Sequence, residues 1–201
     1  MRRTFMLHFI LLCSLLYGGE KSLTYLNGFS FTNTILYGDE AWDHLDQFSV
    51  HSGIILSQPL LIESKYRNRV RFLYTSPQWA QVRQLDGTNY RISSEEEGYG
   101  VNLFAGMEGS LLQGNSFFDL SFQFGPVLDY QSFADFYICN IGVESSVDWE
   151  TGIGKRWSFV LEGGLFYYFY GVHNVGDYSR YNYSIKRGWG ASFFPGLRYT
   201  Y

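Results

Sequence analysis

The sequence predicts an all-β fold, an eight-stranded antiparallel up-and-down transmembrane β-barrel, on three observations. Eight segments alternate apolar with small or polar residues, and a period of two is that of a strand. Aromatic residues make up 20% of the 201 residues, whereas charged residues make up 17%. Beyond residue 20 no apolar run reaches the roughly 20 residues that a membrane helix needs. A chain that crosses a bilayer without such helices must form a closed barrel.

The last segment, 188–201, shows the pattern that decides between a soluble sheet and a membrane barrel. One face is bulky and apolar, with Trp189, Ala191, Phe193, Pro195, Leu197, Tyr199 and Tyr201. The other face is mostly small or polar, with Gly188, Gly190, Ser192, Phe194, Gly196, Arg198 and Thr200. A membrane barrel turns its large apolar side chains to lipid and its small or polar ones to a crowded lumen. This segment therefore predicts a lipid-facing strand.

Seven earlier segments alternate in the same way. In order they are 26–37, 48–57, 66–75, 98–108, 118–130, 140–149 and 157–170. The outward faces begin with Phe29, Phe31, Ile35 and Tyr37 in the first segment and with Phe48, Val50, Ile54 and Leu56 in the second. The fifth carries Phe118, Leu120, Phe122, Phe124, Pro126, Leu128 and Tyr130. Eight such strands are enough to close a small barrel.

The connections predict the orientation, because small outer-membrane barrels have short inner turns and longer outer loops. With both chain ends on the inner side, the inner turns are 58–65, 109–116 and 150–156. The outer loops are then 38–47, 76–97, 131–139 and 171–186. Pro126 and Pro195 lie within strands and each removes a ladder donor, so a bulge or kink is expected at both.

Charged residues on the inward faces predict a lumen network of both signs. Its expected members are Arg67, Arg69, Arg71, Glu108, Asp119, Glu144, Asp148, Glu162 and Arg198. An eight-stranded barrel has room for little more than side chains, and isolated buried charges are costly, so these groups should pair. The favoured interpretation is a salt-bridge plug, and the alternative is a gated or selective ion path.

The first 19 residues have the pattern of a secretory signal peptide. Arg2 and Arg3 precede an apolar run that ends near Leu16, with cleavage expected near Gly18 or Gly19. We therefore expect a barrel domain over 20–201. Without the leader the chain has 13 basic and 19 acidic side chains, a net charge of −6, which disfavours nucleic acid as a partner. Only Cys139 remains, so no internal disulfide is expected.

No catalytic, metal or cofactor site is predicted. His51 with Ser52 and His173 with Ser179 are the candidates for acyl chemistry, but adjacent strand residues such as His51 and Ser52 point to opposite faces. An inward His51 is better explained as a lumen hydrogen-bonding group. The acidic stretch 39–46 lacks a defined calcium-ligand spacing, and 151–156 departs from a phosphate loop.

A terminal strand that ends in an aromatic residue, with apolar residues at alternate positions, resembles the assembly signal of bacterial outer-membrane barrels. The residues that carry it are Phe193, Leu197, Tyr199 and Tyr201. With the leader and eight strands, the chain resembles the OmpA-like, OmpX-like and OmpW-like barrels. The resemblance implies a monomer in a bacterial outer membrane, with membrane lipid and the barrel-assembly machinery as partners.

The resemblance leaves two function classes, because a fold does not fix a function. The first is a structural barrel or an OmpW-like barrel that passes small or hydrophobic solutes, with Pro126 and Pro195 as places for a lateral opening. The second is a surface adhesin that binds a host component through its loops. The Tyr-rich stretch 178–183 has the residue mix of binding loops.

Overall fold

The computed structural model describes residues 20–37, 42–60, 65–83, 87, 89–92, 98–113, 118–133, 136–175 and 184–201. The predicted leader and the stretches 95–97 and 178–183 lie outside these residues. In chain order the strands are β1 (Ser22–Tyr37), β2 (Trp42–Pro59), β3 (Tyr66–Arg83), β4 (Asn89–Ile92), β5 (Tyr99–Gln113), β6 (Asp119–Phe133), β7 (Phe136–Gly152), β8 (Trp157–Val175) and β9 (Ser184–Thr200). Within the described residues, no helix is long and apolar enough to span a membrane.

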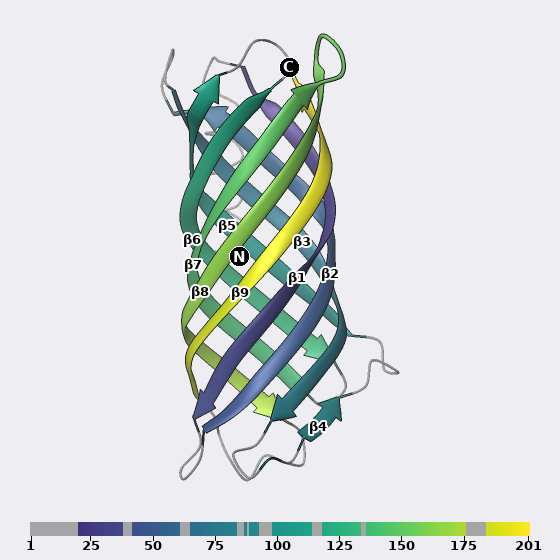
Figure 1. The fold of residues 1–201 in the computed structure, drawn as a ribbon, viewed down its shortest axis with the longest axis vertical. Helices are drawn as coiled ribbons and strands as arrows, with labels where there is room; N and C mark the ends of the chain where they lie inside the picture. Colours follow the sequence, from purple (N-terminus) through teal and green to yellow (C-terminus); the bar gives the residue numbers. More distant parts are fainter. Residues whose placement is uncertain are drawn as a thin grey trace, which may run out of the picture.

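Eight of the strands form a closed antiparallel barrel, as predicted. The order is β2-β1-β9-β8-β7-β6-β5-β3, and pairing of β2 with β3 closes the ring. The short β4 pairs only with the far end of β3 and lies at one end of the barrel (Figure 1). We call that end the loop end, and the opposite end, where β1 begins and β9 finishes, the turn end.

The strands are longer than the sequence predicted. Each barrel strand has 15 to 19 residues and takes up parts of the predicted loops. Only residues 134–135 separate β6 from β7, and only 38–41 separate β1 from β2. The expected contrast between long outer loops and short inner turns is therefore wrong for these two connections. Polar residues in strand ends beyond an apolar band look like loop residues in a sequence, which explains the error.

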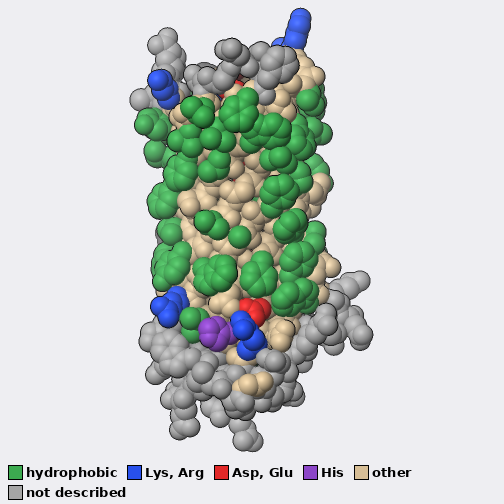
Figure 2. Space-filling model, in the orientation of Figure 1, with side chains coloured by type: hydrophobic (Ala, Val, Ile, Leu, Met, Phe, Trp, Pro, Cys, Tyr) green, Lys and Arg blue, Asp and Glu red, His purple; other side chains and the backbone are tan. Residues whose placement is uncertain are grey.

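The side chains alternate between lipid-facing and lumen-facing positions as the periodicity requires. Outward rings and aliphatic groups cover a broad band of the wall, with charged side chains gathered near its two ends (Figure 2). Tyr25, Phe72, Phe124, Leu165 and Trp189 are among the exposed apolar residues of this band. Such an apolar band is what a barrel surrounded by lipid requires.

The two strand prolines interrupt the ladder without shifting its register. Between β5 and β6, pairing stops after Phe104↔Val127 and resumes at Met107↔Phe124, across from Pro126. Between β1 and β9, pairing stops at Leu26↔Gly196 and resumes at Phe29↔Phe193, across from Pro195. The register does not shift at either proline, so the predicted bulge is wrong, and each gap covers the pair of the proline and one adjacent pair. These two gaps lie on opposite sides of the barrel.

The large lumen rings lie over glycines of neighbouring strands. A Cβ added to Gly190 would stand 2.1 Å from Phe166 Cε2, and one added to Gly28 would stand 2.5 Å from Phe194 Cδ1. Since real carbon atoms cannot approach so closely, any side chain here would displace a ring. The glycines of the inward stripe thus make room for aromatic filling of the lumen.

Candidate functional site: a lumen crossed by ion pairs

Arg69 enters the lumen from β3 because residues two apart on a strand share a face. Its Nη1 donates to Asp148 Oδ2 at 2.6 Å and lies 3.3 Å from Glu108 Oε2. Its Nη2 donates to Glu162 Oε2. The side chains of Arg69, Asp148 and Glu162 are fully buried. Three carboxylates from β5, β7 and β8 therefore surround one guanidinium group.

Arg71, the next inward residue of β3, forms a second set of contacts closer to the loop end. Its two terminal nitrogens donate to the two Glu144 carboxylate oxygens at 2.7 and 2.5 Å, a bidentate geometry. Nη1 also donates to Glu162 Oε1 at 2.5 Å. The guanidinium carbon lies 5.3 Å from the ring centroids of both Phe104 and Phe194. Aromatic faces stabilise a desolvated cation at such distances.

Arg198 of β9 extends the network towards the turn end. Its Nη1 donates to Glu150 Oε2 at 2.5 Å, Nη2 to Asp148 Oδ2 at 3.1 Å and Nε to Thr24 Oγ1 at 3.1 Å. Asp148 thus accepts from both Arg69 and Arg198 and connects the two parts. Five carboxylates face three guanidinium groups, so the network holds an excess of acidic groups.

The position of these strands around the ring shows what the network does to the lumen. Strands β3 and β8 stand four places apart in an eight-strand ring, which makes them diametrically opposite. Arg69 and Arg71 of β3 both contact Glu162 of β8. Direct contacts between opposite walls fill the cross-section at this height. This ion-pair layer is the candidate site.

A second crossing lies nearer the loop end and contains no ion pair. Gln47 Nε2 of β2 donates to Gln131 Oε1 of β6 at 2.6 Å, and Ser49 Oγ of β2 donates to the same oxygen at 2.9 Å. Gln131 Nε2 in turn donates to Asp129 Oδ2 at 2.8 Å. We call this set of side chains the amide layer. The amide layer joins β2 to β6, which stand three places apart in the ring.

His51 lies inward and contacts two hydroxyl groups rather than Ser52. Its Nε2 is 2.7 Å from Ser30 Oγ and its Nδ1 is 2.9 Å from Thr75 Oγ1. The imidazole is buried and nearly perpendicular to the Phe194 ring, with the ring centroids 5.5 Å apart. No carboxylate contacts this histidine among the described residues, so a Ser-His-acid arrangement is not formed here. The side chains of His173 and Ser179 lie outside the described residues.

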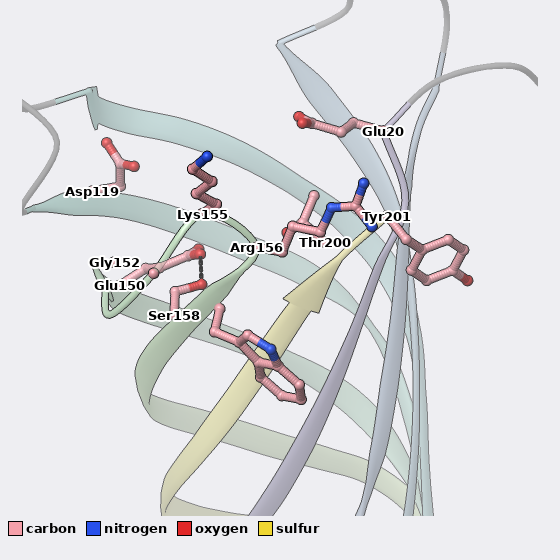
Figure 3. A pocket seen from close by; sticks show the side chains of 11 residues that line it. Glu20, Asp119, Glu150, Gly152, Lys155, Arg156, Ser158, Thr200 and Tyr201 are labelled. Atoms are coloured by element: carbon pink, nitrogen blue, oxygen red, sulfur yellow. Dashed lines mark hydrogen bonds between the residues drawn. The ribbon is translucent and has the colours of Figure 1, made fainter.

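Seven of the nine charged residues expected in the lumen meet in the ion-pair layer, and two do not. Arg67 is half-buried, and its Nη2 lies 3.4 Å from the Glu20 carbonyl oxygen. Asp119 is exposed and lines a hollow at the turn end with Lys155 and Ser158 (Figure 3). Asp119 is the register partner of Glu150 and shares its inward face, but it lies at the turn-end mouth of the lumen, outside the ion-pair layer, because β6 begins at this residue.

Sequence reasoning missed Glu150, Asn102 and the amide layer. Glu150 continues the inward stripe of Glu144 and Asp148 by one more step, and following the period past Trp149 would have found it. Asn102 accepts from Arg71 Nη2 at 3.0 Å. Gln47 and Gln131 fell in segments predicted as loops. Within the described residues, no group of three or more His, Cys, Asp or Glu is arranged to hold a metal ion.

The predicted assembly residues lie on the outer wall at the end of β9. Phe193 and Leu197 are exposed, and Tyr199 and Tyr201 stack with ring centroids 6.1 Å apart. Tyr199 also packs on Trp157, with centroids 4.9 Å apart. These rings form an aromatic rim at the turn end, the position that amphipathic rings prefer at a membrane interface. Recognition by assembly machinery stays a prediction.

Solved structures with the same architecture place this arrangement among known folds. The outer membrane protein OprG from Pseudomonas aeruginosa superposes with a TM-score of 0.59 at 11% identity, covering 91% of this chain and 97% of OprG. Neisserial surface protein A superposes with a TM-score of 0.53 at 11% identity, covering 92% of this chain and 100% of that protein. The chain has the fold of the small outer-membrane barrels.

A third barrel of this kind, outer membrane protein AlkL, gives a TM-score of 0.51 at 12% identity, with 92% of each chain covered. No protein-family model matches the sequence. No curated protein matches it either. The shared fold and the apolar band agree with the bacterial outer-membrane localisation that the sequence predicted. At sequence identities this low, the similarity establishes the fold alone. The function must therefore be argued from the side chains in the lumen.

Proposed function

We propose that the chain is a structural barrel of a bacterial outer membrane whose lumen does not conduct ions or water-soluble solutes. The observation that carries this proposal is the contact of Arg69 and Arg71 with Glu162 on the opposite wall. A pore lined by one charge sign would select ions, whereas here each guanidinium group is paired with carboxylates across the lumen. The amide layer supports the proposal because it crosses the same lumen a second time.

Planar-bilayer recordings test this function. The wild-type barrel should show no stable conductance steps, whereas Arg69→Ala and Glu144→Ala should each raise the conductance because they remove side chains that fill the cross-section. Asp119→Ala is the matched control, since its exposed carboxylate lies outside the ion-pair layer. A wild-type protein that opens a steady ion channel would contradict a closed lumen.

A second candidate function is passage of a small hydrophobic solute sideways into the membrane, as expected for an OmpW-like barrel. The ladder gaps beside Pro126 and Pro195 favour it, since fewer contacts join the strands there. The lumen group of Val127, Phe166 and Tyr168 could receive an apolar solute. Pro126→Val should add one ladder donor and slow solute uptake by liposomes containing the protein. Unchanged uptake would argue against this route.

Adhesion through the outer loops stays a prediction, because its main candidate, the stretch 178–183, lies outside the described residues. Grafting residues 171–186 onto an inert barrel and measuring binding to host matrix would test it. A graft that does not bind host matrix would argue against the adhesin function.

A further inference from the structure

A small polar cluster interrupts the apolar outer wall. It consists of Tyr25 and Asn27 on β1 and Ser52 on β2, and we call it the wall cluster. Asn27 and Ser52 are register partners. The Tyr25 hydroxyl lies 3.3 Å from Asn27 Oδ1 and 3.0 Å from Ser52 Oγ. Tyr25 is 50% exposed, so these groups are on the lipid side and not in the lumen.

The wall cluster stands at mid-height in the apolar band. Along β1 the outward positions between the polar Lys21 and Asn33 run from Leu23 to Phe31, and Asn27 is the central position of that stripe. Along β2 they run from Phe48 to Leu56, and Ser52 is again the central position. Both polar side chains are therefore as far as the band allows from either interface. This is where hydrocarbon offers no hydrogen-bond partner.

The wall cluster is incompletely satisfied by the barrel itself. The hydrogen bond from the Tyr25 hydroxyl engages the Asn27 amide through its oxygen, and the amide nitrogen carries two further N–H donors that face the lipid side. Polar groups left unpaired in hydrocarbon are costly, and polar residues inside a membrane usually have a partner.

We propose that the wall cluster is the centre of a contact surface for a second copy of this chain within the membrane. A two-fold contact places the same patch on both partners, so the patch must be able to pair with itself. The wall cluster meets this requirement, since Asn27 offers both N–H donors and an acceptor oxygen and the hydroxyls of Tyr25 and Ser52 do both as well. Each Asn27 amide donates to the cluster of the other copy.

The surroundings of the wall cluster fit the same partner. Exposed apolar side chains lie around it on β1, β2, β3 and β9, namely Phe29, Ile54, Tyr74, Phe193 and Leu197. Packed against their counterparts, these groups would exclude lipid from the hydrogen bonds at the centre. An acyl chain could not satisfy the amide donors, because it has no acceptor. The family resemblance implied a monomer, whereas this contact would make a dimer. The resemblance did not consider polar residues on the lipid-facing wall.

Energy transfer between copies in liposomes tests the contact. The chain from residue 20 has one cysteine, the half-buried Cys139 on β7, which accepts a donor dye in one batch and an acceptor dye in another. Asn27→Leu removes the amide, and Phe124→Leu is the control, because Phe124 is an exposed lipid-facing residue of β6, on the opposite side of the ring from β1 and β2. Heat-modifiable gel migration shows whether each variant folds, and Asn27→Leu should fold at least as well as wild type because it removes an unpaired polar group from lipid.

The expected result is energy transfer in wild type and in Phe124→Leu that persists when lipid dilutes random encounters. Asn27→Leu should raise the dissociation constant of the pair by about tenfold or more. This expectation takes each of the two lost hydrogen bonds to be as strong as a side-chain hydrogen bond between membrane helices. A wild type without transfer under dilution would overturn the proposal, as would a folded Asn27→Leu that associates as wild type does. Neither result depends on whether the lumen conducts, so failure here is separable from failure of the proposed function.

Discussion

The two crossings of the lumen use different chemistry for the same geometric task. In the ion-pair layer, guanidinium groups of β3 and β9 contact carboxylates of β5, β7 and β8 directly. In the amide layer, neutral groups of β2 meet β6. Removing one partner from a buried ion pair leaves an unpaired charge, whereas removing a neutral partner leaves only an unmet hydrogen bond. The two layers should therefore differ in how strongly they depend on single residues.

The largest effect is expected for Glu162→Ala. This change removes the opposite-wall partner of both Arg69 and Arg71, which keep Asp148 and Glu144, and the loss of two hydrogen bonds between charged groups costs about 3–5 kcal/mol. The free energy of unfolding, measured by urea titration in lipid vesicles, should fall by about that amount. Asp119→Ala removes an exposed carboxylate and should change it by less than about 0.5 kcal/mol. Equal effects in the two variants would mean that burial in the layer has no special role.

A smaller loss is expected for Gly190→Ala, which tests the packing that surrounds both layers. The new methyl group would overlap Phe166 and the Phe31 carbonyl oxygen, 2.4 Å away, and such overpacking costs about 1–3 kcal/mol. Gly163→Ala is the control, because nothing lies within 4 Å of its added Cβ. Urea titration should separate the two variants. Similar stabilities would show that the rings of the lumen can move aside freely.

The amide layer should tolerate Gln131→Ala better than the ion-pair layer tolerates Glu162→Ala. The change leaves Gln47 Nε2 without its acceptor, at a cost of about 1–2 kcal/mol. Planar-bilayer conductance should stay at the wild-type level, since the ion-pair layer still crosses the lumen. If Gln131→Ala conducts as much as Arg69→Ala does, the ion-pair layer alone does not close the lumen.

The smallest effect is expected outside the lumen. Arg83 Nε pairs with Asp46 Oδ2 at 2.7 Å near the loop end, but the Arg83 side chain is 49% exposed. Arg83→Ala should lower the free energy of unfolding by at most about 1 kcal/mol. Added salt should reduce this difference, whereas the effect of Glu162→Ala should be nearly unchanged by salt. A strong salt effect on the Glu162 variant would indicate a solvated lumen.

The fold could be predicted because period two is visible in every barrel strand, and the inward arginines of β3 follow from the same count. Strand ends were less predictable, since outside the membrane a barrel wall no longer needs apolar residues, so Gln47 and Gln131 resembled loop residues. Partners across the lumen could not be predicted at all. Alternation gives the face on which Glu162 lies, but its contact with Arg69 depends on how β3 and β8 stand in the closed ring.

A double-mutant cycle on Arg69 and Glu162 tests the contact between opposite walls most directly. Unfolding free energies of Arg69→Ala, Glu162→Ala and the double variant give the coupling between these residues, which are 93 positions apart in the chain. A direct buried contact predicts a coupling of about 2 kcal/mol or more. A coupling within about 0.5 kcal/mol of zero would mean that the two walls do not meet.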